Sequence, residues 1–229
     1  MTCKLDCPEC SGTGFFRYDV SLDDPRFGKL YPCPNVPAEE LFDFAKHGIN
    51  QDEIAGLKWK ALKNTPHVKP LKDAVDKLLS RGYGWLFVWG APGLTKTVAL
   101  KIAVLSMLQN KEAAAYVRMA DILENLRSVY AEGGDGNAEA KLAYWQKIPL
   151  LAIDEFDRAR DTEFAQEKRF ALMDDRYVTA IRQKSMTILA ANQDPQEFDN
   201  YLADRIYDGR FQVVHLEGTS LRPALEWAK

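Results

Sequence analysis

A lysine and a threonine, Lys96 and Thr97, follow a short glycine-bearing loop that begins directly after an apolar run. Residues 85–89 read WLFVW and predict a buried strand, and the stretch VALKIAVLSMLQ after Thr97 predicts a helix. Strand, loop, Lys-Thr and helix form the context of a phosphate-binding P-loop, whose backbone N–H groups point at the phosphates. Lys96 would reach the β- and γ-phosphates, and the Thr97 hydroxyl would ligate Mg²⁺. The predicted nucleotide-binding residues are Gly90, Ala91, Pro92, Gly93, Leu94, Thr95, Lys96 and Thr97.

The loop departs at one position from the pattern G-x-x-x-x-G-K-[ST]. Position 95 is Thr instead of Gly, and Gly93 supplies backbone freedom two residues earlier. A Cβ atom at position 95 restricts the dihedral angles of the loop and could crowd a phosphate. We expect the loop to bind nucleotide in spite of Thr95, and whether Thr95 weakens that binding stays open.

Two later apolar runs also end in polar residues. Residues 148–155 read IPLLAIDE, and residues 186–192 read MTILAAN. If the first of these strands lies beside the P-loop strand, Asp154 reaches the Mg²⁺ site in its outer shell and Glu155 can polarise an attacking water. Asn192, at the tip of the second strand, could hold that water or touch the γ-phosphate. The order and spacing of the three stretches predict binding and hydrolysis of ATP.

All four cysteines lie within the first 33 residues, at Cys3, Cys7, Cys10 and Cys33. In a reducing compartment such a cluster indicates metal binding before disulfides, and four thiolates suit tetrahedral zinc. The stretch between Cys10 and Cys33 predicts a hairpin that carries Cys33 back to the others. We expect a structural zinc, with Cys3 as the least certain ligand. Unmetallated cysteines and a redox pair are the alternatives.

Composition limits the partners and the location of the chain. It has 229 residues and a formal net charge of −3, so any contact with nucleic acid must come from a local patch. Residues 57–81 form such a patch, because seven basic and two acidic residues give them a net charge of +5. They predict a helix from Leu71 to Gly82, which is either a solvated flank or a surface that tracks a DNA strand. No apolar run spans a membrane and no signal core is present, so we expect a cytoplasmic protein.

The predicted fold is α/β, a parallel sheet flanked by helices, with a small zinc hairpin module at the N-terminus. We expect strands near residues 85–89, 115–118, 148–153, 186–191 and 212–216, and nucleotide at the carboxyl ends of the first and third. The expected domains are a zinc module over 1–36, a basic helical connector over 37–81 and an ATPase domain over 82–229.

Together these residues resemble an AAA+ ATPase. GAPGLTKT is similar to its Walker A motif, LLAIDE to Walker B and TILAAN to sensor 1. More narrowly, residues 116–130, 171–195 and 202–223 resemble the DnaC/DnaI-type helicase loaders and the IstB-like transposition ATPases. The resemblance implies an AAA+ core without a full C-terminal lid. It also implies that Arg205 is an arginine finger acting on a neighbouring subunit, with Arg210 as the competing candidate, and that Arg222 touches nucleotide.

The resemblance implies a replication function. An ATP-bound chain would assemble on single-stranded DNA, deliver a replicative helicase and cycle by hydrolysis. One alternative is an IstB-like regulator that binds duplex DNA and a transposase. Another is a zinc-containing adaptor that binds nucleotide but no longer hydrolyses it, because of Thr95.

Overall fold

The computed structural model describes most of the chain from residue 66 onward and separate stretches before it. The described residues are 7–11, 15–21, 24, 26–29, 31–33, 35, 47–50, 52–62, 66–131, 135–158 and 162–220. Two residues with predicted roles, Cys3 and Arg222, lie outside these ranges. Of the helices in the described ranges, none has the length and apolar character needed to cross a bilayer.

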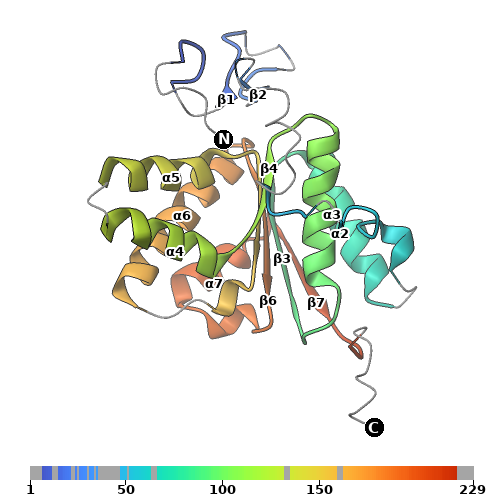
Figure 1. The fold of residues 1–229 in the computed structure, drawn as a ribbon. Coiled ribbons are helices and arrows are strands. Elements are labelled where there is room, and N and C mark those ends of the chain that lie inside the picture. Colours follow the sequence, from blue (N-terminus) through green and yellow to red (C-terminus); the bar gives the residue numbers. More distant parts are fainter. Residues whose placement is uncertain are drawn as a thin grey trace.

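A five-stranded parallel sheet forms the centre of the molecule (Figure 1). Its strands are β3 (Gly84–Gly90), β4 (Ala114–Arg118), β5 (Leu150–Asp154), β6 (Met186–Ala191) and β7 (Gln212–Leu216). Their order across the sheet is β4-β5-β6-β3-β7. We expected the strand that ends in Asp154 to lie beside the P-loop strand. It does not, because β6 pairs with both strands and separates them.

Helices cover both faces of the sheet, which explains the continuous apolar runs of the strands. Leu86 and Val88 of β3 pack on one face, whereas Trp85 and Phe87 pack on the other. The first face carries α2 (Val68–Arg81) and α3 (Lys96–Gln109). The second face carries α4 (Met119–Ala131), α5 (Asp135–Lys147), α6 (Glu163–Ile181) and α7 (Asn200–Ile206) (Figure 1). Short 3₁₀ turns are η2 (Trp59–Ala61), η3 (Phe156–Arg158) and η4 (Pro195–Glu197).

Helix α2 begins three residues before the predicted start at Leu71. Pro70 occupies its first turn, where a missing N–H leaves no helical hydrogen bond unmade. The helix ends as predicted at Gly82, which adopts a left-handed conformation with φ 76°. Buried Leu71, Val75 and Leu78 join the same core as the strands, so this part of the predicted connector packs against the sheet.

A fully buried arginine, Arg176 of α6, ties this helix to the sheet. Its Nε donates to Thr187 Oγ1 at 2.9 Å and its Nη1 to Ile148 O at 2.5 Å, and Nη2 donates to Met186 O. Burial lowers the pKa of Arg176 to about 9. The guanidinium thus joins the starts of β5 and β6 through neutral acceptors.

The N-terminal hairpin lies at the end of the sheet where the strands begin (Figure 1). It pairs β1 (Phe15–Phe16) with β2 (Tyr31–Pro32) in antiparallel fashion. Phe15 is buried and stacks on Tyr144 of α5, with 6.1 Å between the ring centroids. This contact fixes the hairpin against the helical layer.

Candidate nucleotide-binding site

The predicted phosphate loop connects β3 to α3 at the carboxyl end of the sheet. Gly90 ends the strand with φ 141°, and a Cβ there would lie 2.3 Å from Leu216 O of the adjacent strand. Only glycine therefore fits this position. Thr95 caps α3 in a left-handed conformation with φ 65° and ψ 8°, which a β-branched residue rarely adopts. The general P-loop pattern has glycine at the position that Thr95 occupies, and this left-handed backbone explains why.

Lys96 bridges the loop and a second strand. It is 8 % exposed, and its Nζ donates to Gly90 O at 2.5 Å, Ala91 O at 3.0 Å and Asn192 Oδ1 at 3.1 Å. The ammonium group is therefore held at the tip of β6 as well as over its own loop. The structure brings Lys96 and Asn192 together, as the sequence predicted.

Asp154 is the meeting point of three elements. Its Oδ2 accepts hydrogen bonds from Thr97 Oγ1 at 2.6 Å and from the hydroxyl of Tyr116 at 2.8 Å. Its Oδ1 accepts from the backbone N–H of Glu155 at 2.9 Å. Burial, and then the charge of Asp154, raise the pKa of Tyr116 far above its ordinary value, so its hydroxyl stays protonated and donates. Tyr116 was not predicted from the sequence, because only the order of the strands places it beside β5.

Glu155 follows Asp154 in a strained conformation. Its φ is 48°, in the left-handed region that non-glycine residues rarely occupy. Arg158 Nη1 lies 3.6 Å from Glu155 Oε1. Local strain at a non-glycine residue is frequent in active sites, where the surrounding structure enforces it. This geometry is consistent with the role expected for Glu155.

Lys96, Thr97, Asp154, Glu155 and Asn192 line one cavity of about 580 Å³. Its lining also includes six residues that were not predicted as site residues, namely Ala61, Leu62, Val98, Arg158, Ala190 and Ala191. Ala61 closes the 3₁₀ turn η2, so the segment before α2 forms one wall. An ammonium, a hydroxyl, a carboxylate and a helix N-terminus are the groups that bind a Mg²⁺-triphosphate. The residues present therefore fit MgATP, with Lys96 and the loop for the phosphates and Thr97 and Asp154 for the metal.

The two candidate finger arginines lie away from this cavity in their own chain. Arg205 of α7 stands 3.2 Å above the ring centroid of Tyr201 and pairs with Asp174 at 3.2 Å. Arg210 pairs with Asp208 and donates to the Tyr177 hydroxyl at 2.9 Å. Neither guanidinium is among the groups that line the P-loop cavity.

Three of the four cysteines converge in the hairpin. Cys7, Cys10 and Cys33 are buried, and their sulfur atoms all lie within 4.8 Å of one another. The sulfurs of Cys7 and Cys33 are 3.6 Å apart, and Asn35 Nδ2 donates to Cys7 Sγ at 3.4 Å. Tetrahedral zinc with Zn–S bonds of about 2.3 Å separates its sulfurs by about 3.8 Å. Three thiolates at this spacing fit zinc, and the fourth predicted ligand, Cys3, is outside the described residues.

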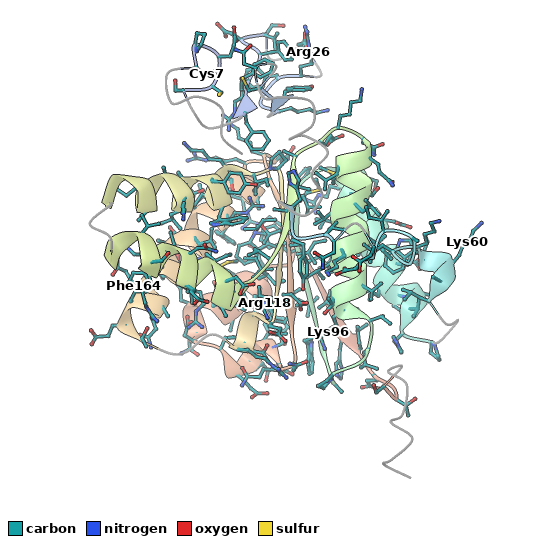
Figure 2. All side chains as sticks on the ribbon, in the orientation of Figure 1. Cys7, Arg26, Lys60, Lys96, Arg118 and Phe164 are labelled. Atoms are coloured by element: carbon teal, nitrogen blue, oxygen red, sulfur yellow. The ribbon has the colours of Figure 1, made fainter. Side chains whose placement is uncertain are left out.

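Figure 2 shows that the hairpin and the P-loop occupy opposite ends of the sheet. Cys7 lies beyond the end at which the strands begin, whereas Lys96 lies where they finish. The metal cluster and the nucleotide cavity are therefore separate sites.

Solved structures share this fold. A replication initiator DnaA bound to AMPPCP and single-stranded DNA matches 71 % of this chain and 50 % of its own, at 19 % identity and a TM-score of 0.61. Domain III of Thermotoga maritima DnaA matches 71 % of this chain and 67 % of its own, at 20 % identity and a TM-score of 0.60. DnaI matches 76 % of this chain and 95 % of its own, at 14 % identity and a TM-score of 0.55.

The chain spans about half the length of the DnaA structure bound to DNA. No protein-family model matches the sequence, and no curated protein matches it. At identities of 20 % or less, the structural matches establish the fold. The chain therefore shares its α/β fold with the replication initiation protein DnaA and with DnaI.

Proposed function

We propose that this chain is an ATP-dependent helicase loader that assembles on single-stranded DNA and delivers a replicative helicase. The observation that carries the ATPase part is the convergence of Lys96, Thr97, Asp154 and Asn192 on one cavity. The loader part is supported by the fold shared with DnaI and with a DnaA that binds single-stranded DNA. The cytoplasm is the expected location.

Each cavity residue has a role in this proposal. Lys96 compensates the charge of the β- and γ-phosphates, and Thr97 with Asp154 holds Mg²⁺, which would draw negative charge from the transferring phosphoryl group. Glu155 orients the attacking water, and Asn192 contacts that water or the γ-phosphate. Lys96→Ala should abolish binding of a fluorescent ATP analogue, and unchanged affinity would show that the cavity has another ligand.

Arg205 completes the site of a neighbouring subunit in this proposal. A finger supplied in trans links hydrolysis to assembly, because it stabilises transition-state charge only when two chains meet. Arg205→Ala should keep ATP binding and lose turnover. Mixing it with a Glu155→Gln chain should restore some turnover, since each chain supplies what the other lacks. Failure of this mixture to recover activity would transfer the role to Arg210.

The zinc module completes the proposal. Cys7, Cys10 and Cys33 hold zinc together with Cys3, and the metal stabilises a module too small to fold by burial alone. We assign this module to residues 1–36 and propose that it binds the helicase. Residues 37–81 connect it to the ATPase domain over 82–229, and Arg222 contacts nucleotide.

The decisive experiment adds the purified chain and ATP to a ring helicase and closed circles of single-stranded DNA. Unwinding of an annealed strand that depends on the chain supports loading, with Lys96→Ala as the inactive control. Assembly on duplex DNA with no loading would favour the IstB-like alternative. The conformation of Thr95 favours the adaptor alternative, which predicts equal background turnover for the wild type and Glu155→Gln.

A further inference from the structure

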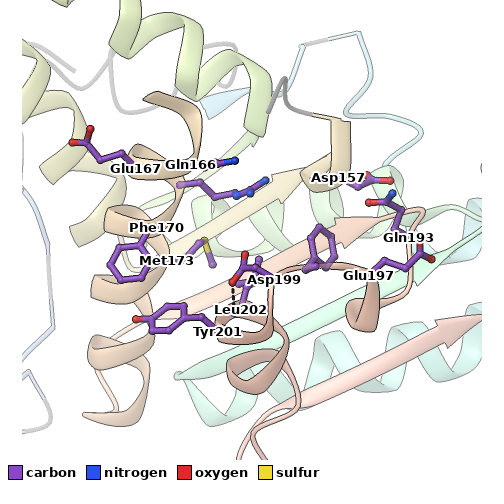
Figure 3. A pocket seen from close by; sticks show the side chains of 12 residues that line it. Asp157, Gln166, Glu167, Phe170, Met173, Gln193, Glu197, Asp199, Tyr201 and Leu202 are labelled. Atoms are coloured by element: carbon purple, nitrogen blue, oxygen red, sulfur yellow. Dashed lines mark hydrogen bonds between the residues drawn. The ribbon is translucent and has the colours of Figure 1, made fainter. Parts of the chain in front are cut away.

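A second cavity, larger than the one at the P-loop, lies between α6 and α7. Its volume is about 670 Å³, and Phe170, Met173 and Leu202 give it an apolar floor (Figure 3). Phe170 is 52 % exposed and packs against Tyr201, with 4.7 Å between the ring centroids. An exposed aromatic side chain beside a groove is typical of a surface that contacts another protein.

The rim of this groove is acidic. Asp157, Glu167, Glu197 and Asp199 line it, against a single basic lining residue, Arg169. Asp157 Oδ2 accepts from the backbone N–H of Asn192 at 3.0 Å. Its Oδ1 is buried and accepts no hydrogen bond from the described part of the chain. The groove is therefore suited to bind a segment that carries positive charge and hydrogen-bond donors.

The opposite face of the same molecule carries a segment with these properties. Lys60 lies on the 3₁₀ turn η2, Lys58 directly precedes it, and both are exposed. The turn lies on the face of the sheet that carries α2 and α3. Figure 2 shows Lys60 on the far side of the molecule from α6 and α7. Partly buried Trp59 anchors the turn to that core. The two lysines are therefore presented on a fixed turn.

Each of these two surfaces adjoins one half of the proposed composite active site. Tyr201 lines the acidic groove, and the guanidinium of Arg205 lies over its ring. Ala61 and Leu62, which directly follow Lys60, line the nucleotide cavity. If the groove of one chain receives the turn of the next, the arginine-bearing helix of the first approaches the nucleotide cavity of the second.

We propose that the acidic groove between α6 and α7 docks the lysine-bearing turn of a second copy of this chain, head to tail. This inference rests on the proposed self-assembly and names the contact that guides it. Because the two surfaces differ, the contact repeats from chain to chain and builds a ring or a filament instead of a closed dimer. Opposite charges on the two surfaces favour this register over face-to-face pairing.

Charge reversal tests the pairing directly. One variant carries Lys58→Glu and Lys60→Glu, and another carries Glu167→Lys and Glu197→Lys. Both are combined with Glu155→Gln, so that bound ATP persists. Assembly with ATP and without DNA is followed by sedimentation velocity, and ATP binding is titrated separately. Glu124→Lys with Glu139→Lys, on exposed positions of α4 and α5, is the control that matches the net-charge change of the groove variant.

Each variant alone should raise the chain concentration at half-maximal assembly by at least about tenfold, because like charges then face each other. An equimolar mixture of the two variants should restore assembly, since every groove then meets a turn of opposite charge. The control should assemble as the parent does, and all variants should keep ATP binding.

The outcomes separate the two proposals. Assembly of the parent with no loss in either variant would overturn the groove contact and leave the proposed function standing. Loss in both variants without rescue by mixing would also overturn the pairing of these two surfaces. A parent that binds ATP yet stays monomeric, both without DNA and after single-stranded DNA is added, would refute self-assembly itself, and the docking contact with it.

Discussion

Replacing Thr95 by glycine should stabilise the nucleotide-free protein, although the change removes a side chain. Thr95 occupies φ 65°, where its Cβ approaches the backbone, and its hydroxyl is buried without a hydrogen-bond partner in the described part of the chain. Two separate costs therefore fall on one residue, one from the backbone and one from the side chain.

The size of the gain follows from these costs. A left-handed conformation costs a residue with a Cβ roughly 1–2 kcal/mol. A buried polar group without a partner costs about 1–3 kcal/mol. Glycine gives back about 0.5–1 kcal/mol through the greater freedom of its unfolded chain. We expect Thr95→Gly to raise the free energy of unfolding by about 2 kcal/mol, and Tm by about 4–8 °C for a domain of this size.

Two further variants separate the costs. Thr95→Ala removes the hydroxyl but keeps the Cβ, and should recover only about 1 kcal/mol. Gln183 is an exposed residue with a similar φ of 59°, in the turn after α6 and away from the nucleotide cavity. Gln183→Gly should gain only the backbone difference, about 0.5–1 kcal/mol.

Urea unfolding of the four proteins in the absence of nucleotide measures these differences. Equal gains for Thr95→Ala and Thr95→Gly would show that the strain at φ 65° is no larger than the roughly 0.5–1 kcal/mol that glycine loses through the freedom of its unfolded chain. A less stable Thr95→Gly would show that the threonine side chain makes contacts that outweigh both costs, and the reasoning would be refuted.

Three other changes test separate parts of the molecule. Tyr116→Phe removes one hydroxyl donor from Asp154. It should raise the Mg²⁺ concentration needed for ATP binding about tenfold, with little change in Tm. An unchanged Mg²⁺ requirement would show that Tyr116 contributes to packing only. Arg176→Met leaves the carbonyls at the starts of β5 and β6 without a donor. It should lower the free energy of unfolding, measured in urea, by about 3 kcal/mol or more. A loss below about 1 kcal/mol would show that the hydrogen bonds of Arg176 do not hold α6 to the sheet. Wild type purified with zinc should hold about one zinc per chain by elemental analysis, and Cys33→Ser close to none, with ATP affinity preserved; equal metal content would remove zinc from the cluster.

The strands β3, β5 and β6 were predictable because each is buried on both faces. Helices on both sides leave no solvent-facing positions, so each central strand is a short apolar run bounded by polar or glycine residues. Glu155 and Asn192 were predictable for a related reason. Polar residues at the carboxyl ends of parallel strands gather at one edge whatever the order of the strands.

Strand order was not predictable in the same way. Nothing in the apolar pattern of β5 or β6 says which of them pairs with β3, so the expected neighbour of the P-loop strand was wrong. The contributions of Tyr116 and Leu62 were hidden for the same reason, because they depend on which segments lie side by side. The clamp at Arg176 was also hidden, since a lone arginine in an amphipathic helix normally faces solvent.

The hairpin and the phosphate loop stand at the two ends of parallel strands that are rigidly packed on both sides. In the proposed loader, a protein gripped at the cysteine end would thus leave the entry of ATP and the release of ADP unobstructed. It would also lie beyond the reach of the small side-chain movements that accompany hydrolysis. In the proposed loader, ATP turnover could therefore alter the grip on the bound protein only by changing how neighbouring chains are arranged, so that release would be a property of the proposed assembly and not of the single subunit.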